Sequence, residues 1–394
     1  MNGGPFDLIV AGDPRAVDPA ARDAAGCGAK VLLLEAGDLA CGTSSASTKL
    51  VHGGLRYLEY REFALVREAL QEREVLLRSA PHIMWPLRFV MPHDAAMRPA
   101  WMIRIGLFLY DHLARREVLP GSEGVDLRRS PYGEPLKAEY TKGFVYSDGW
   151  VDDARLVLLN ALDAREHGAV LHTRTTVTGA RRHADHWTAT LRCADGDRTL
   201  KARALVNAAG PWAEGFLREV AAPARGEALA TKSLRLVKGS HIIVHKRFQH
   251  DHAYIFQNPD KRIIFAIPYE DDFTLIGTTD VELAPDALAG FGKARIDEGE
   301  IAYLCEQASR YFREPVVASD VVWTYAGVRP LLDDASGDPS AVTRDYLLET
   351  HAEGGAPLRP DTDFQRLLSA VGQRHPWLPP SLARRLARAY GARL

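Results

Sequence analysis

The first forty residues carry the hydrophobic pattern of a strand, a helix and a second strand. Phe6 to Ala11 is a short apolar run, Ala16 to Gly26 is rich in alanine, and Ala29 to Leu34 is a second apolar run that ends at Glu35. Short, nearly continuous apolar runs are typical of buried strands in a parallel sheet. The pattern therefore predicts a βαβ unit at the start of an α/β domain.

Two later segments favour helices. Between Arg61 and Arg78, apolar residues such as Phe63 and Leu70 recur at helical spacing, and Pro81 closes the segment. Asp152 has the side chain of a helix N-cap, and the segment that follows it runs to Gly168. The sequence predicts one helix in each segment.

Strand patterns dominate the rest of the chain. Three runs come first: Ala169 to Thr178, His186 to Cys193 and Thr199 to Ala209, with Asp195–Gly196 marking a tight turn. Shorter runs follow Lys238, and their connectors, NPDK and YEDD, suit hairpins: Ser240 to His245, Tyr254 to Gln257, Ile263 to Tyr269 and Phe273 to Thr278. These runs predict an antiparallel sheet in a second domain, inserted into the first or packed against it.

The longest apolar stretch, Ala100 to Tyr110, allows two interpretations. It has about half of the roughly 20 residues that span a bilayer, and it contains Arg104, so we do not expect it to cross a membrane. It can lie on a membrane surface or form a partly buried core helix. The first interpretation rests on apolar Trp101, Ile103, Leu107 and Phe108 and on basic Arg98, Arg104, Arg115 and Arg116.

Composition narrows the function classes. A formal charge of -2 and a pI near 6.7 give no broad positive field for nucleic acid. The four cysteines are scattered, without metal-ligand spacing, which favours a reducing, cytoplasmic compartment and no metal. No basic region precedes a long apolar run at the N-terminus, so we expect no secretory signal.

The turn after the first strand departs from the dinucleotide-binding pattern GxGxxG. It reads Gly12-Asp-Pro-Arg-Ala-Val17, so only the first glycine remains; Asp13 adds a negative charge and Pro14 removes an amide donor. Two accounts of this turn are open: a short stretch of the coding sequence that is read out of frame, or sequence drift under relaxed selection. Glu35 argues for a nucleotide, because it follows Gly12 at close to the roughly 20 residues expected of a ribose-binding acid. Alone, it could equally be a solvated carboxylate.

A longer segment carries a family resemblance. Asp38 to Glu59, DLACGTSSASTKLVHGGLRYLE, resembles the flavin-contacting signature of the FAD-dependent, quinone-linked respiratory glycerol-3-phosphate dehydrogenases. Further matching motifs are KGSHIIV from Lys238, IGTTD from Ile276, WTYAGVRPL from Trp323 and TRDY from Thr343. The resemblance covers roughly residues 6 to 357. It implies a two-domain α/β flavoprotein of the D-amino-acid oxidase-like superfamily, with a Rossmann-like FAD domain and an antiparallel β substrate domain.

The resemblance also implies a division of the chain and a shortened C-terminal part. The expected parts are an FAD-binding domain at 6–90 and 146–215, a connecting and substrate-side helical segment at 91–145, an antiparallel β substrate domain at 216–325, a return to the FAD domain at 326–357 and a remnant of a helical domain at 358–394, with a basic helix from Pro380 to Ala392. The family segment FGGK[LI]TT has no counterpart after Pro357, so we expect an internal deletion and a truncated helical domain.

The cofactor implied by the resemblance is FAD. The residues expected to hold it are Gly12 and Glu35 for the ADP half, Thr43, Ser44, Ser45, Ser47, Lys49 and Leu50 along the pyrophosphate and flavin, Val177 at the adenine, and Ala209 and Gly210 at a second close approach. Hydroxyl, amide and ammonium donors suit an anionic cofactor. The alternative for the 43–50 stretch is an ordinary loop rich in serine and threonine.

The substrate residues follow from the same resemblance. Arg56, Tyr57, Arg329 and Arg344 would hold a phosphate dianion, for which guanidinium groups have suitable geometry. His52 and His241 are candidates for the base, jointly and without assignment, with Thr278 as a hydrogen-bond partner. A surface salt bridge is the alternative for an isolated arginine, and a satisfied core histidine is the alternative for each histidine.

The implied activity is oxidation of sn-glycerol 3-phosphate to dihydroxyacetone phosphate, with hydride transfer to FAD and electrons passed to a quinone at the membrane surface. The expected location is cytoplasmic, with peripheral membrane association, and a homodimer is left open. Three alternatives remain: an impaired pseudoenzyme or gene fragment, a glycerol-3-phosphate oxidase that uses oxygen, and a more distant amino-acid oxidase.

Overall fold

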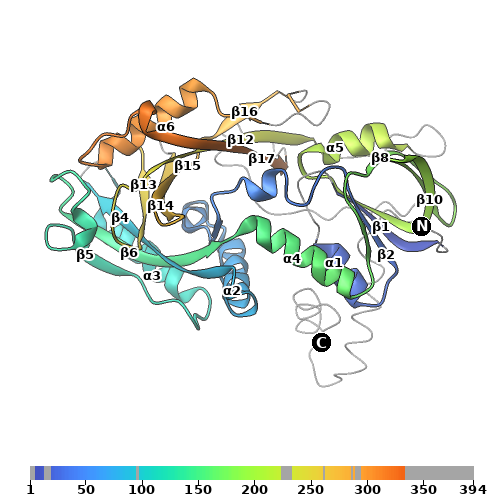
Figure 1. The fold of residues 1–394 in the computed structure, drawn as a ribbon. Coiled ribbons are helices and arrows are strands. Elements are labelled where there is room, and N and C mark those ends of the chain that lie inside the picture. The colour runs from blue at the N-terminus through green and yellow to red at the C-terminus, as the bar shows by residue number, and fades with distance from the viewer. Residues whose placement is uncertain are drawn as a thin grey trace, which may run out of the picture.

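The computed structural model describes residues 5–12, 19–94, 97–222, 233–260, 262–284, 287–288 and 294–332. These residues form two β-sheets with helices packed on them (Figure 1). The altered glycine turn, Arg344 and the helix expected near the C-terminus lie outside the described residues. Sheet A has seven strands and sheet B has ten.

Sheet A contains the predicted βαβ unit. Its strand order is β11 (Ala221–Ala222), β8 (Thr176–Arg182), β9 (Trp187–Cys193), β10 (Gly196–Ala208), β1 (Phe6–Gly12), β2 (Val31–Glu35) and β7 (Val170–His172). Strands β10, β1, β2 and β7 are parallel to one another, whereas β8, β9 and β10 form an antiparallel meander. The turn between β9 and β10 includes Gly196, whose φ of 115° favours glycine.

Two helices cover one face of sheet A. Alternate residues of β1, Leu8 and Val10, pack against alanines of α1 (Pro19–Gly26) and α4 (Asp153–Glu166). Helix α1 begins at its proline, where a missing amide hydrogen costs nothing. Helix α4 has the predicted N-cap, since the Asp152 carboxylate accepts a hydrogen bond from Arg155 N.

One strand prediction was wrong. The run from Ala169 to Thr178 is two strands, β7 and β8, separated by a bend at Arg174, whose φ is 52°. Backbone hydrogen bonds explain the bend: Arg174 N donates to Gly37 O at 2.7 Å and Thr175 N donates to Glu35 O at 2.9 Å. The chain therefore turns around the end of β2 and leaves the parallel part of the sheet.

Sheet B contains all four of the short predicted runs after Lys238. Its path is β16 (Val281–Leu283), β12 (Leu234–His245), β15 (Phe273–Gly277), β14 (Ile263–Tyr269), β13 (Ala253–Gln257), β4 (Met84–His93), β6 (Lys142–Val151) and β3 (Leu50–Val51), with β17 (Val321–Leu332) beside β12 and β5 (Glu123–Asp126) beside β6. The pairing is antiparallel except between β13 and β4, which are parallel.

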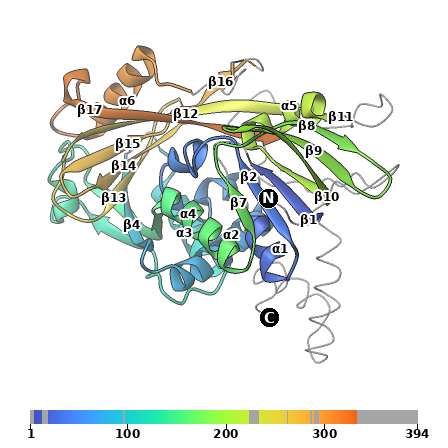
Figure 2. The same ribbon diagram turned by 45° about the vertical axis from the view of Figure 1, so that its right-hand side comes forward.

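Helices cover both faces of sheet B. Helix α6 (Glu298–Tyr311) packs on the face that carries Ile242 and Val244, while α2 (Phe63–Ser79) and α3 (Ala100–His112) pack on the opposite face (Figure 2). The predicted helix between Arg61 and Arg78 is thus confirmed as α2. A further short helix, α5 (Ala213–Gly215), lies beside sheet A.

The expected domain limits cut through sheet B. Residue 90 lies within β4 and residue 146 lies within β6, and both strands belong to this sheet. Besides α3, the segment 91–145 contributes β5 and the first residues of β6. The domain limits stay predictions, but the sheet that frames the candidate site draws strands from both sides of them.

Candidate active site

The predicted nucleotide residues meet at one edge of sheet A. Gly12 ends β1 and is paired with Glu35 on one side and with Ala208 on the other, which places Ala209 next to it. This is the carboxyl edge of parallel strands, where α/β folds bind nucleotides. Glu35 is not a solvated carboxylate, because it is 1% exposed and its Oε1 accepts a hydrogen bond from Gly37 N at 3.0 Å.

Two further predicted nucleotide positions lie close to this edge in the chain. Val177 is buried at the start of β8. It follows by two residues Thr175, whose N donates a hydrogen bond to Glu35 O. Gly210 follows Ala209 with φ of 51°, a backbone conformation that favours glycine.

The serine- and threonine-rich segment joins the two sheets. A 3₁₀ turn at Thr43–Ser45 leads into β3, and Thr43 Oγ1 accepts a hydrogen bond from Val328 N at 3.2 Å and donates one to Val328 O at 3.1 Å. Gly327 allows this approach, because a Cβ there would lie 3.0 Å from Ala46 O. The segment is therefore a fixed strip against β17 and not an ordinary surface loop.

Lys49 has a partner that the sequence did not indicate. Its ammonium lies 2.7 Å from Asp153 Oδ1 in a buried ion pair, and Asp153 Oδ2 accepts a hydrogen bond from Ser47 Oγ at 2.7 Å. Lys49 also has φ of 59°. The carboxylate thus holds the strip in place and reduces the net positive charge that Lys49 offers to an anion.

A cavity of about 390 Å³ brings the predicted substrate residues together. It lies where the strip meets sheet B, and its volume is within the range of small-molecule sites, about 300–1,000 Å³. Its lining includes Leu50, His52, Arg56, Tyr57, His241, Thr278 and Arg329. These residues come from four separate segments of the chain, so the motifs that suggested them converge in space.

His241 is the more deeply buried of the two histidines. Its Nε2 lies 2.9 Å from Thr48 Oγ1 and its ring stacks on Tyr325 at 4.7 Å between centroids. Burial, reinforced by the charges of Arg329 and Lys49, lowers the pKa of His241 to about 3. His241 is therefore neutral near pH 7, whereas His52 is exposed and its Nδ1 accepts a hydrogen bond from Gly54 N at 3.0 Å.

Arg329 crosses the floor of the cavity from β17. Its Nη1 lies 2.5 Å from Asp280 Oδ1, and its Nη2 donates to Thr279 O at 3.0 Å and to Thr278 Oγ1 at 3.3 Å. Gly239 leaves room for it, since a Cβ there would lie 2.1 Å from Arg329 Nη2. The guanidinium is thus held by one carboxylate and still lines the cavity.

A buried ionic cluster lies behind the His52 loop. Arg73 of α2 forms an ion pair with Asp148 of β6, and both side chains are almost fully buried. Tyr110 donates to Asp148 Oδ1 at 2.8 Å, and Gly53 N donates to Tyr110 Oη at 2.7 Å. Burial, followed by the charge of Asp148, raises the pKa of Tyr110, so its hydroxyl stays a donor. The cluster anchors the backbone between His52 and Gly54.

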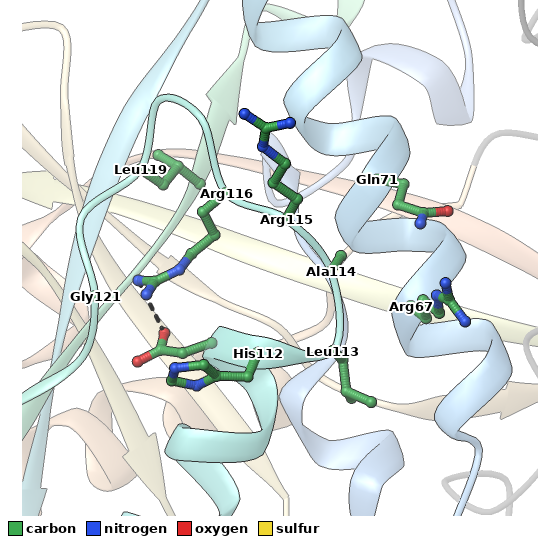
Figure 3. A pocket seen from close by; sticks show the side chains of 10 residues that line it. Arg67, Gln71, His112, Leu113, Ala114, Arg115, Arg116, Leu119 and Gly121 are labelled. Atoms are coloured by element: carbon green, nitrogen blue, oxygen red, sulfur yellow. Dashed lines mark ion pairs between the residues drawn. The ribbon is translucent and has the colours of Figure 1, made fainter.

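A second cavity, of about 720 Å³, lies between α2 and the loop after α3 (Figure 3). Arg67 and Gln71 project from α2, and Arg116 is directed at Asp111 with Nη1 to Oδ1 at 3.4 Å (Figure 3). None of the predicted substrate or cofactor residues lines it. A third cavity, of about 860 Å³, is lined by the predicted cofactor residues Thr43, Ser45 and Lys49. The candidate substrate site is therefore the cavity of about 390 Å³, which the predicted substrate residues line.

Sequence reasoning missed the acidic partners of the site. Asp153, Asp148 and Asp280 neutralise Lys49, Arg73 and Arg329 respectively. Asp280 was within a motif, IGTTD, but the motif alone did not assign it a partner. The other two lie in the stretch YSDGWVDD, in which three aspartates fall within six residues. This cluster of acidic residues was the one feature of the sequence that could have indicated them.

The comparisons agree with the geometry. The family model described as FAD dependent oxidoreductase matches residues 20–357. A D-erythritol 1-phosphate dehydrogenase of Brucella abortus is 47% identical, over 98% of this chain and 84% of that protein. A glycerol-3-phosphate dehydrogenase of Pseudomonas aeruginosa is 54% identical, over 89% of this chain and 67% of that protein.

A solved structure has the same fold. The glycerol-3-phosphate dehydrogenase from Bacillus halodurans complexed with FAD superposes with a TM-score of 0.66 and 25% identity, covering 100% of this chain and 77% of that one. The D-amino-acid oxidase-like fold that the sequence predicted is thus confirmed.

Proposed function

Because the chain belongs to the family of FAD-dependent oxidoreductases, we propose that it oxidises sn-glycerol 3-phosphate to dihydroxyacetone phosphate with FAD as cofactor. The observation that carries the proposal is the convergence of His52, Arg56, His241, Thr278 and Arg329 on one cavity. Two arginines suit a phosphate dianion, and two histidines suit the removal of a hydroxyl proton.

The described residues fit FAD. Gly12, Glu35 and Ala209 share the carboxyl edge of sheet A, and the strip from Thr43 to Lys49 runs from there to the cavity. A cavity of about 860 Å³, lined by Thr43, Ser45 and Lys49 among others, gives a cofactor room beside this strip. Bound there, FAD would supply the acceptor for the hydride that leaves C2 of the substrate.

The protein residues supply binding and proton handling. Arg56 and Arg329 bind the phosphate, and Asp280 keeps the Arg329 fork oriented. Neutral His241 is fixed by Thr48 and by the Tyr325 ring, so its ring has a defined orientation in the cavity wall. We propose that His52 and His241 jointly handle the proton, and His52 is the better placed to exchange it with solvent because it is exposed.

Acid is expected to destabilise the protein through His241. Its pKa falls from an ordinary 6.5 to about 3 on folding, so between these values the unfolded chain binds a proton that the folded protein does not. Linkage then lowers the free energy of unfolding by about 1.4 kcal/mol per pH unit in that window, and the stability is fully present above pH 6.5. Between pH 7 and pH 5 the loss from this group is about 2 kcal/mol.

Urea unfolding at the two pH values measures this loss. His241→Gln is expected to lose about 2 kcal/mol less than the parent protein, and His52→Gln, at an exposed histidine, is the control. An equal pH dependence in the parent and His241→Gln would show that His241 is not held neutral by the fold.

We further propose that the electrons pass to a quinone in a membrane, and that α3 contacts the bilayer surface. Trp101, Ile105 and Phe108 lie on one side of α3 and are 62%, 52% and 54% exposed. Leu107 and Tyr110 of the same helix are buried against sheet B. In the described part of the chain no helix is both long and apolar enough to span a bilayer. An exposed apolar helix face of this kind suits shallow insertion.

Replacing Ile105 and Phe108 together by serine is expected to weaken binding to phospholipid vesicles at least about tenfold, since each exposed side chain would otherwise bury apolar area. Turnover with a soluble dye acceptor is expected to be unchanged. The control replaces Val317 and Val322, which are 47% and 42% exposed near the start of β17, by serine. Vesicle sedimentation that does not distinguish the two double variants would rule out α3 as the contact.

A second candidate substrate is D-erythritol 1-phosphate. The Brucella abortus relative covers more of this chain, 98%, than the Pseudomonas aeruginosa relative does. Both substrates offer a phosphate and a neighbouring hydroxyl to the same residues. The ratio of kcat/KM for the two compounds decides between them, and peroxide release in air would identify the acceptor as oxygen instead of quinone.

A further inference from the structure

We infer that Glu300 of α6 is a positioning residue that holds both His241 and Thr278 in the geometry needed for substrate oxidation. The inference rests on the proposed function. Glu300 is buried, and its Oε1 accepts hydrogen bonds from Ser240 Oγ at 2.8 Å and from Thr279 Oγ1 at 2.7 Å. These two hydroxyls flank the candidate site residues directly in the chain.

The position of Ser240 explains how the carboxylate reaches the site from behind. Successive side chains of a strand point to opposite faces, so Ser240 and His241 of β12 face opposite sides of sheet B. Helix α6 packs on the Ser240 side, where Ile242 also lies. Glu300 therefore anchors β12 one residue before His241 without entering the cavity.

Regular strand pairing is interrupted at this point. Strand β12 pairs with β15 as far as His241 and Gly277, and with β16 from Lys238 and Val281 onward. The residues between, 278–280, rely on other bonds: Ser240 N donates to Thr279 Oγ1 at 2.9 Å, and Thr279 N donates to Ser240 O at 3.3 Å. The Glu300 carboxylate accepts hydrogen bonds from both Ser240 Oγ and Thr279 Oγ1 and so links the two segments where strand pairing is interrupted.

The charge on Glu300 is itself supported. Its Oε2 lies 2.7 Å from Lys238 Nζ and accepts a hydrogen bond from Asp297 N at 3.1 Å. The second contact is half of a capping box at the start of α6, where the helix dipole favours a carboxylate. A buried carboxylate with partners on both oxygens is a rigid anchor. Lys238, Ser240 and Thr279 thus all contact the same carboxylate.

Glu300→Gln tests the assignment. A glutamine amide has nearly the same shape, but its NH₂ group would face either the Lys238 ammonium and Asp297 N or the two hydroxyls that now donate to Glu300, so one pair of contacts must change. Glu298→Gln is the matched control, because Glu298 lies in the same first turn of α6 and is exposed. Thr279→Val, which removes one hydroxyl at constant volume, keeps the test available if Glu300→Gln does not fold.

The measurement is the anaerobic rate of flavin reduction per bound flavin, as a function of sn-glycerol 3-phosphate concentration. Glu300→Gln is expected to lower the limiting rate at least about tenfold relative to Glu298→Gln, because small displacements of reacting groups cost rate. The half-saturating concentration is expected to change less than the limiting rate, because Arg329, which donates to Thr279 O at 3.0 Å, keeps its ion pair with Asp280. Thr279→Val is expected to shift the rate in the same direction.

Hydrogen exchange separates the possible failures. Amides at 276–281 are expected to exchange faster in Glu300→Gln than in Glu298→Gln. Equal limiting rates per flavin in the two variants would overturn the inference and leave Glu300 a residue of the fold alone. Absence of flavin reduction in the parent protein would instead overturn the proposed function, while faster exchange at 276–281 would still support the anchor.

Discussion

Replacing Arg329 by methionine is expected to lower kcat/KM for sn-glycerol 3-phosphate by about a hundredfold to a thousandfold, mainly through KM. The Arg329 side chain is partly buried, and a charge-assisted contact that a phosphate shields from water contributes about 2–5 kcal/mol, where 1.4 kcal/mol corresponds to about tenfold. The loss is compounded because Asp280, now 2.5 Å from Arg329, would be left beside the dianion without its partner. Arg329→Lys is expected to retain little more kcat/KM than Arg329→Met, since lysine lacks the planar guanidinium fork.

Steady-state kinetics with a soluble acceptor measure this loss. Arg235→Met is the matched control: Arg235 forms a bidentate pair with Glu282 on the same sheet, with Nε to Oε1 at 2.9 Å and Nη2 to Oε2 at 2.8 Å, and does not line the cavity. Comparable KM values for Arg329→Met and Arg235→Met would remove Arg329 from the substrate site.

Replacing Arg73 by methionine is expected to reduce the free energy of unfolding by about 3–5 kcal/mol, which is the cost of leaving a buried charge without its partner. Asp148 would then be a buried carboxylate that keeps only Tyr110 and Gly53 as donors. Because Gly53 belongs to the loop that carries His52, turnover of the surviving folded protein is expected to fall as well.

Urea denaturation measures the stability change, and Arg78→Met is the control on the same helix. Arg78 pairs with Glu117 at 2.5 Å, but both side chains are exposed, and such pairs contribute about 0–1 kcal/mol. The double variant Arg73→Met with Asp148→Leu is expected to recover part of the loss, because the buried Asp148 charge is removed with its partner and Glu74, the other carboxylate beside Arg73, keeps its hydrogen bonds from Glu117 N and Val118 N. A cost for Arg73→Met no larger than that for Arg78→Met would show that the cluster does not support the fold.

The sequence predicted the positions of the site residues better than their partners. His52, Arg56, His241, Thr278 and Arg329 were named from separate motifs, and they line one cavity. Their roles stay predictions, whereas their convergence is a structural fact. Motifs succeed here because each one fixes several neighbouring residues on a defined strand or turn.

The acidic partners could not be predicted in the same way. Glu300 contacts Ser240 across sixty positions of chain, and Asp153 contacts Lys49 from another helix. A single acidic residue on an amphipathic helix has the same sequence pattern whether it is buried or solvated. Only the packing of α6 and α4 against the sheets distinguishes the two cases.

The one wrong strand prediction has a similar cause. The run from Ala169 to Thr178 is apolar enough to be one strand, and the bend at Arg174 arises from backbone bonds to Gly37 and Glu35. The parallel pairing of β13 with β4 could not be predicted either, because it joins segments far apart in the chain. Hairpin connectors indicate only antiparallel pairing between neighbouring strands.

The most direct test is the visible absorbance of the purified chain, recorded before and after the addition of FAD and then of sn-glycerol 3-phosphate without oxygen. The proposed function predicts flavin bands at close to one FAD per chain, which the substrate bleaches. A folded protein that retains no FAD, or whose bound flavin is reduced by neither sn-glycerol 3-phosphate nor D-erythritol 1-phosphate, would contradict it and leave a protein with the family's fold but without its chemistry.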